Sequence, residues 1–160
     1  MADIRTHYLD ASALVKLLVE EDGSLVVRTY IGPHATRIVT SLCFAETLGV
    51  LKAKHLRNLL SNEQYLSACE ELMASIRNET LEIEDIDISQ RETYEEVEYL
   101  AKKHSLDISD AFQLVTLKRG LLSSLEGESR PILITADKRL ATAAKSEGYR
   151  VWDCMNDPIP

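Results

Sequence analysis

The chain has 160 residues, of which 45% are hydrophobic and 28% are charged. This ordinary globular composition predicts one domain with a buried core and argues against a disordered, fibrous or membrane protein. The formal net charge of -8 argues against a protein that coats nucleic acid through a broad basic face. It does not exclude a nuclease, because carboxylates that hold divalent cations lower the formal charge, while the occupied site presents positive charge to a phosphate.

The cysteines and the N-terminal sequence bear on the cellular compartment. Cys43, Cys69 and Cys154 are odd in number, far apart and without C-x-x-C spacing, which argues against a disulfide framework and against a thiolate zinc site. No apolar run approaches the ~20 residues that span a bilayer, and the N-terminus carries charge where a signal peptide has an apolar core. We therefore expect reduced thiols and a cytoplasmic protein.

The first part of the chain alternates strands and helices. In chain order we expect a strand over residues 7–9, a helix over 12–20, a helix over about 25–31 and a strand over 37–40. Asp10 comes directly after the first strand. Gly23 and the Gly32-Pro33 pair end the two helices, because glycine and proline interrupt helical backbone.

The middle of the chain is mostly helical. We expect helices over about 42–55 and 62–76, a strand over 81–86, and helices over 89–103 and 108–119. Ser41 is the expected N-cap of the first of these helices, which carries Glu46 in its second turn. Residues 81–86 alternate apolar and acidic side chains, which is typical of an edge strand.

The last part begins with a predicted loop over residues 121–130. The apolar run at 131–135 suits a buried parallel strand, and Asp137 follows it. A helix over about 138–147 and a strand over 149–152 complete the chain, and Gly148 separates them.

Strands that alternate with helices and are apolar on both faces predict an α/β fold with three α/β/α layers and a mostly parallel central sheet. We expect a single domain over residues 1–160. Such sheets bind ligands beyond the carboxyl ends of their strands. Asp10 and Asp137 lie at that edge, and Glu46 and Asp110 lie early in helices that begin near it, so we expect these acids in one cleft.

Four carboxylates in one cleft indicate a cation site. Like charges a few ångströms apart raise one another's pKa, and a bound metal ion removes this conflict. Oxygen ligands suit hard ions such as Mg²⁺ or Mn²⁺, and Mg²⁺ keeps positions open for phosphate oxygens. The residue types therefore point to phosphodiester cleavage.

Each acid also has a structural interpretation. Asp10 and Asp137 could cap helices, since a side-chain oxygen can accept from the free N–H groups of the first turn. Glu46 lies in an apolar stretch and could belong to a buried salt bridge. Asp107 and Asp110 could be first-turn acids favoured by the helix dipole. The specificity lies in the combination of the acids.

The remaining polar residues give weaker signals. The histidines have no metal-ligand spacing and adjoin no recognisable nucleophile, so we interpret them as structural or solvated; they are His7, His34, His55 and His104. The acidic run over 79–87 is interpreted as a solvated strand and turn. Lys138 and Arg139 could contact backbone phosphate, but ordinary helix-surface charge is the favoured interpretation.

Four segments resemble PIN-domain nucleases and, among them, the VapC-like toxins of type II toxin–antitoxin pairs. The order and spacing of these segments agree with the family across nearly the whole chain. They are HYLDASALVKLLVEEDGS, FAETLGVL, LDISDAFQL and ILITADKRLATAAKSEGYRVWD.

The resemblance implies a role for each matching residue. Asp10, Asp110 and Asp137 would be metal ligands, and Glu46 would be a ligand or would act through water. Ser12 and Thr135 would orient a ligand or a bound water. The family places its aspartate directly before the alanine, which favours Asp110 over Asp107, so Asp107 is kept as a supporting acid.

The resemblance also implies an activity and partners. The chain would be an endoribonuclease that uses Mg²⁺ or Mn²⁺ to hydrolyse RNA with a metal-bound water. It would be a homodimer, with a small antitoxin protein covering the cleft.

Three alternatives are kept. The long stretch between Glu46 and Asp110 and the loop over 121–130 leave room for a non-toxin PIN nuclease in RNA processing. A catalytically silent binding module of the same fold is the second. The third, a haloacid-dehalogenase-like phosphatase, is disfavoured because Ser12 stands where that family has a second aspartate.

Overall fold

The computed structural model describes residues 6–33 and 35–160. Residues 1–5, which supply most of the charged N-terminus, and His34 lie outside this range, and so do the expectations made for them. In the two described segments, no helix combines the length and the apolar character needed to cross a membrane.

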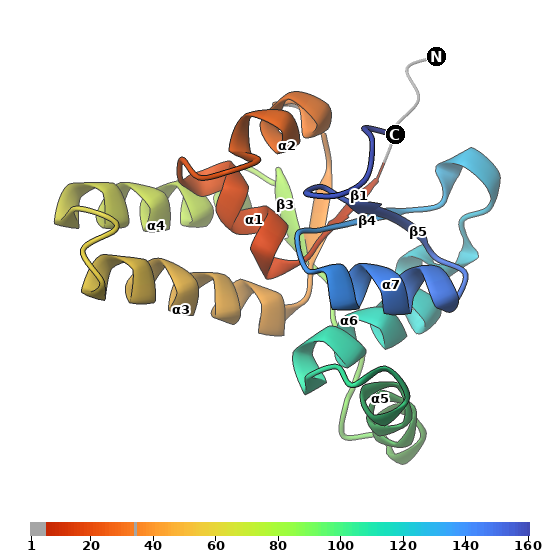
Figure 1. Cartoon of the computed structure of the whole chain (residues 1–160). Helices are drawn as coiled ribbons and strands as arrows, with labels where there is room; N and C mark the ends of the chain where they lie inside the picture. Colours follow the sequence, from red (N-terminus) through yellow and green to blue (C-terminus); the bar gives the residue numbers. More distant parts are fainter. Residues whose placement is uncertain (1–5, 34) are drawn as a thin grey trace.

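Five parallel strands form one sheet in the order β3-β2-β1-β4-β5 (Figure 1). The strands are β1 (His7–Leu9), β2 (Arg37–Val39), β3 (Leu81–Ile83), β4 (Ile132–Thr135) and β5 (Arg150–Asp153). The prediction of an edge strand near residue 81 is confirmed, since β3 is the outer neighbour of β2.

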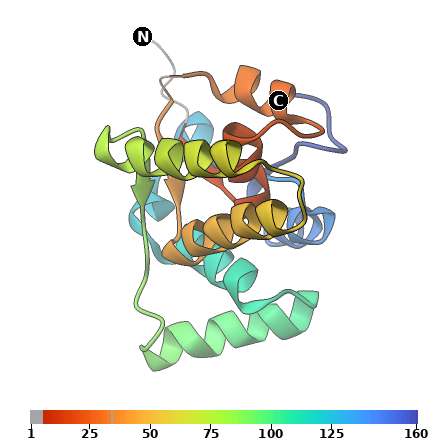
Figure 2. The same cartoon turned by 90° about the vertical axis from the view of Figure 1, so that its left-hand side faces the viewer.

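Helices cover both faces of this sheet, which confirms the predicted three-layer α/β/α fold. They are α1 (Ala11–Leu18), α2 (Ser24–Ile31), α3 (Ser41–Leu56), α4 (Asn62–Arg77), α5 (Arg91–His104), α6 (Ile108–Arg119) and α7 (Lys138–Ser146). Helices α3 and α4 form a projecting hairpin, and α5 packs outermost, on α6 (Figure 2).

The strands supply side chains to both layers because successive residues of a strand point to opposite faces. Tyr8 and Leu133 are buried against α5, α6 and α7. Leu9 and Ile134, the next residues along the same two strands, are buried on the other face against α1, α2 and α4. A strand buried on both faces has a continuous apolar sequence, which is the pattern that predicted β4.

Several predicted boundaries are wrong by a few residues. Thr40, not Ser41, caps α3, because its side-chain oxygen accepts from the Cys43 N–H at 3.1 Å. Helix α5 begins two residues later than expected, since the Asp87 carboxylate accepts from both the backbone N–H and the hydroxyl of Ser89 in a turn. The predicted loop over 121–130 contains two short 3-10 helices, η1 (Leu121–Ser124) and η2 (Gly127–Ser129).

The strand order creates a switch point beside β1. The chain runs outward from β1 to β2 and β3, then returns to place β4 on the other side of β1. In sheets of this kind the connections diverge above the carboxyl ends of the two central strands and leave a crevice there. Asp10 directly follows β1 and Asp137 follows β4 by two residues, so both acids lie at this crevice.

Candidate metal centre

Asp10 lies at the switch point and is 4% exposed. Its Oδ2 accepts from the Ser12 N–H, from the Ser12 hydroxyl and, at 2.8 Å, from the Thr135 hydroxyl. The contact with the Ser12 N–H makes Asp10 the N-cap of α1. The structural interpretation of Asp10 is therefore correct, but a cap uses only one of the two carboxylate oxygens.

The two hydroxyls beside Asp10 have fixed directions. The Thr135 oxygen accepts from the Asp137 N–H and the Ser12 oxygen accepts from the Ala136 N–H, both at 2.9 Å. Because each oxygen receives an N–H, its own proton is free to point at Asp10. Burial raises the pKa of the Asp10 carboxyl, and the hydrogen bonds from Ser12 and Thr135 oppose that rise. The network joins the end of β1 to the end of β4.

Replacing Thr135 by Val should therefore reduce stability by about 1–3 kcal/mol, because two buried hydrogen-bonding groups, on Asp10 and Asp137, lose a partner. Thr47→Val is the matched control, since Thr47 is equally buried but its hydroxyl only donates to the Cys43 carbonyl in its own helix. Denaturant unfolding of the two variants measures the difference. Equal losses of stability would show that the hydrogen bonds of Thr135 between β1 and β4 contribute no more than those of a hydroxyl within one helix.

Asp110 is half-buried in the first turn of α6, and its pKa is raised to about 8. Burial is the largest cause, and the negative charges of four other acids add to it, those of Asp10, Asp107, Asp137 and Glu46. A carboxyl with this pKa binds a proton near neutral pH when no cation is present. The charges of the other four acids therefore reach the Asp110 carboxyl.

Glu46 is exposed on α3 and faces the same acids. Partial burial of its carboxyl raises the pKa, and the charges of Asp10, Asp107 and Asp137 raise it further. No Lys, Arg or His that the structure describes lies within 4.0 Å of its carboxylate, so the buried salt bridge considered for Glu46 is wrong.

Ser109 is a residue of this site that the sequence did not single out. Its hydroxyl lies 3.1 Å from the Glu46 Oε2 and 3.0 Å from the Asp107 Oδ1. One hydroxyl proton serves one carboxylate at a time, so Ser109 links α3 to the start of α6 through a shared donor. Its position between Asp107 and Asp110 in the sequence was the only available signal.

Asp107 and Asp137 both cap helices. The Asp107 Oδ1 accepts from the Asp110 N–H at 2.9 Å, and the Asp137 Oδ1 accepts from the N–H groups of Arg139 and Leu140. In each case one oxygen satisfies the helix and the other is left for a second role. Capping and ion binding are compatible here because they use different oxygens.

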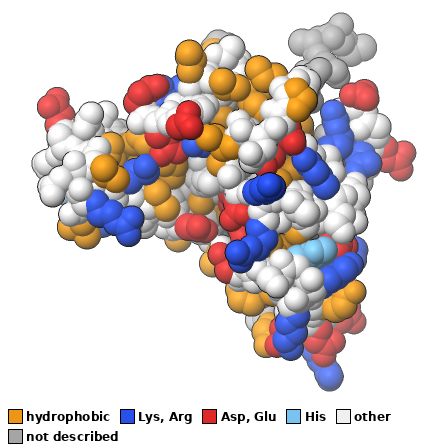
Figure 3. Space-filling model, viewed as in Figure 1, with side chains coloured by type: hydrophobic (Ala, Val, Ile, Leu, Met, Phe, Trp, Pro, Cys, Tyr) orange, Lys and Arg blue, Asp and Glu red, His pale blue; other side chains and the backbone are white. Residues whose placement is uncertain are grey.

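Together these acids form what we call the acidic cluster. Its members are Asp10, Glu46, Asp107, Asp110 and Asp137. Figure 3 shows acidic side chains gathered in the hollow between α3 and α6, with basic side chains on the α7 side. Over residues 6–33 and 35–160, none of the five is in an ion pair with a basic residue.

The donor chemistry of the acidic cluster fits a hard divalent cation, since all its ligand atoms are oxygens and no side-chain cation neutralises them. The side chains are not drawn together, however. In the described part of the chain, no three His, Cys, Asp or Glu side chains lie as a closed group that could hold a metal ion. Mutual repulsion of uncompensated carboxylates favours such an open arrangement.

Comparison with known proteins identifies the family. Residues 7–146 match the PIN domain, which covers the sheet up to β4, all seven helices and every member of the acidic cluster. The chain belongs to the PIN domain family. Among solved structures, PAE2754 from Pyrobaculum aerophilum is similar, with a TM-score of 0.56 and 20% sequence identity over 92% of this chain and 90% of that chain. No curated protein matches the sequence.

The family assignment supports a nuclease-type fold. PIN domains are generally nucleases and typically bind divalent metal ions. The similarity to PAE2754 shows the shared fold alone at this level of identity. The PIN assignment confirms the PIN part of the resemblance found in the sequence. The roles of individual residues rest on the geometry of the acidic cluster.

Proposed function

We propose that this PIN domain is a Mg²⁺- or Mn²⁺-dependent endoribonuclease that hydrolyses RNA phosphodiester bonds. The observation that carries the proposal is the acidic cluster at the switch point of the sheet. Its five carboxylates lack basic partners in the described chain, and the charges of the other members raise the pKa of Asp110 and of Glu46. A structural role alone gives no reason to gather so many unneutralised charges.

Each residue has a defined part in this proposal. Asp10, Asp110 and Asp137 would hold the cation directly, and Glu46 would hold it directly or through water. A bound divalent cation would lower the pKa of water and stabilise the charge that develops on phosphate. Ser12 and Thr135 would keep the Asp10 carboxylate in one orientation, as their hydrogen bonds to Oδ2 do.

The proposal is tested by incubating the purified chain with structured RNA in Mg²⁺ or Mn²⁺ and then in excess EDTA. Cleavage should appear with either ion, stop in EDTA and return when the ion is restored. Cleavage that persists in EDTA would contradict the proposed role of the cation. A chain that binds RNA but cuts none under any of these conditions would instead be a silent binding module.

We further propose that the protein is the toxin of a type II toxin–antitoxin pair. The support is the agreement of four sequence segments with VapC-like toxins, each carrying at least one acid of the cluster. Expression in bacteria should arrest growth, and co-expression of the neighbouring small gene should relieve the arrest. Unimpaired growth during expression of chain that cleaves RNA in vitro would favour a PIN nuclease of RNA processing.

A homodimer is part of the same proposal. Several large apolar side chains are open to solvent, among them Leu25, Leu56 and Leu59, which are 73%, 69% and 65% exposed. Exposed apolar residues of this size are consistent with an interface, although single ones are common on monomers. Light scattering at working concentration should give twice the mass of the chain, and a monomer mass would contradict the dimer.

A further inference from the structure

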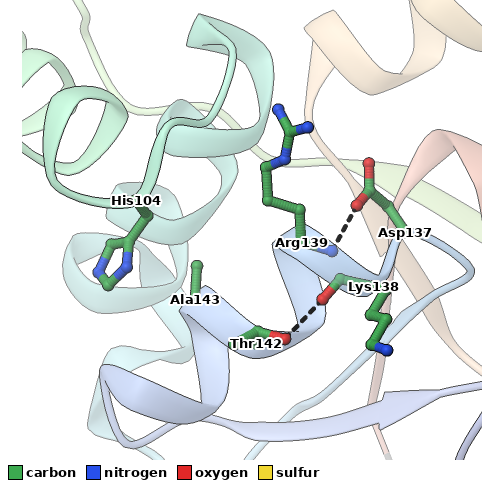
Figure 4. Close-up of a pocket in the computed structure, with 6 residues that line it drawn as sticks. All are labelled: His104, Asp137, Lys138, Arg139, Thr142 and Ala143. Carbon is green, nitrogen blue, oxygen red and sulfur yellow. Dashed lines mark hydrogen bonds between the residues drawn. The ribbon is translucent and has the colours of Figure 1, made fainter.

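A pocket of about 660 Å³ lies beside the acidic cluster at the start of α7 (Figure 4). Its lining residues come from the end of α5 and the first turns of α7, and they are His104, Asp137, Lys138, Arg139, Thr142 and Ala143. Asp137 belongs both to this pocket and to the acidic cluster, since its charge acts on Asp110 and Glu46. A ligand in the pocket therefore adjoins the cluster.

Arg139 is the basic residue of this pocket whose side chain extends to the side of the Asp137 carboxylate. In Figure 4 the guanidinium of Arg139 and the carboxylate of Asp137 extend to the same side of the helix start, whereas the Lys138 side chain runs the other way. The Arg139 Nη1 donates to the Ser105 carbonyl at 3.1 Å, which holds the guanidinium over the pocket. The other N–H groups of the guanidinium remain available to donate to a ligand.

The charge of Arg139 is not neutralised by the protein. Most lysines and arginines in the described segments lie within 4.0 Å of a carboxylate, but Arg139 and Lys138 do not. An unpaired guanidinium with several free donors matches the oxygens of a phosphate, which it can bind in a bidentate manner. Arg139 adjoins the acidic cluster through Asp137, because both residues line the pocket and the Arg139 backbone N–H donates to the Asp137 Oδ1.

We infer that Arg139 and this pocket form a subsite for a backbone phosphate of the RNA, next to the phosphate that is cleaved. The inference rests on the proposed ribonuclease function and adds how the substrate is held. It also revises the sequence interpretation, in which Lys138 and Arg139 were equivalent helix-surface charges. Of the two, only Arg139 extends to the side on which the Asp137 carboxylate lies.

The test is the affinity of the full chain for a short fluorescent RNA, measured by anisotropy in EDTA over a series of salt concentrations. Arg139→Gln should weaken binding about tenfold and reduce the slope of log K against log [salt] by about 0.7, the loss of one phosphate contact. Arg130→Gln is the matched control, because Arg130 also donates to a backbone carbonyl, that of Gly148, and has no carboxylate partner. The control should bind as the unmodified chain does.

Arg139→Lys keeps the charge but not the two parallel donors, so it should keep the salt slope of the unmodified chain and bind with an affinity between those of the unmodified chain and Arg139→Gln. A Lys variant whose salt slope falls as far as that of the Gln variant would indicate a structural role and overturn the subsite. Equal binding by the Arg139→Gln and Arg130→Gln variants would overturn it too, as would no measurable binding by the unmodified chain. Cleavage that needs Asp10 but not Arg139 would leave the nuclease proposal standing without the subsite. Cleavage that needs neither would reject both.

Discussion

Replacing Asp10 by Asn is expected to reduce RNA cleavage by about three orders of magnitude, the loss of about 4 kcal/mol of transition-state stabilisation. Asp10 is the most buried member of the acidic cluster, and its Oδ2 is held by two hydroxyls and one backbone N–H. An amide at this position has no negative charge with which to hold a cation. Initial rates of cleavage at saturating Mg²⁺ or Mn²⁺ measure the loss.

The same variant should remain folded when no cation is present. Burial raises the pKa of the Asp10 carboxyl, so its ionised form destabilises the metal-free protein, and a neutral amide avoids that cost. The melting temperature in EDTA should be no lower than that of the unmodified chain. Asp22→Asn, at an exposed aspartate outside the cluster, is the control and should keep full activity. A folded Asp10→Asn variant with full activity would reject the proposed site.

The metal-free protein is expected to lose stability as the pH rises from about 4 to about 8. The pKa of Asp110 is raised from 3.8 to about 8 in the folded chain, so between these values the folded state keeps a proton that the unfolded state has released. The contribution of this group is therefore fully present below about pH 4 and is lost by about pH 8. One proton gives a slope of at most about 1.4 kcal/mol per pH unit, which solvent screening reduces at a half-buried group.

Asp110→Asn isolates this effect from that of the other acids. The variant should be more stable than the unmodified chain at pH 8 and equal to it at pH 4, in denaturant unfolding with EDTA present. Adding Mn²⁺ should reverse the order at pH 8, because a ligand that binds only the folded state stabilises it and competes with the proton. A variant whose stability parallels that of the unmodified chain at every pH would show that Asp110 does not carry the raised pKa.

The fold could be predicted well because the central strands have recognisable sequence patterns. β4 is a short apolar run and β1 is a short β-prone run, an aspartate follows each within two residues, and both strands are buried on both faces. Helix ends were less predictable where neighbouring residues share the same capping chemistry. Thr40 and Ser41 both offer a hydroxyl, and the choice of Thr40 depends on where β2 ends, which the sequence pattern alone does not define.

The sequence predicted where the acids of the cluster lie in the fold, but it did not predict the contacts of their side chains. The order of strands and acids placed Asp10 and Asp137 at one sheet edge, but the sequence left open a buried salt bridge for Glu46, which the structure does not show in the described residues. The link from Ser109 to Glu46 crosses 63 residues of chain, so no local pattern reveals it. Side-chain directions, such as the divergence of Lys138 and Arg139, appear only in three dimensions.

Calorimetric titration of Mn²⁺ into the metal-free protein tests most directly whether the acidic cluster is one cation site. The unmodified chain and Asp22→Asn should show the same saturable binding, accompanied by proton release near neutral pH because Asp110 must give up its proton. Asp10→Asn and Asp110→Asn should each weaken binding at least about tenfold, equivalent to about 1.4 kcal/mol. No saturable binding by the unmodified chain, or equal affinity in Asp10→Asn and Asp22→Asn, would contradict the assignment of these carboxylates to a metal centre.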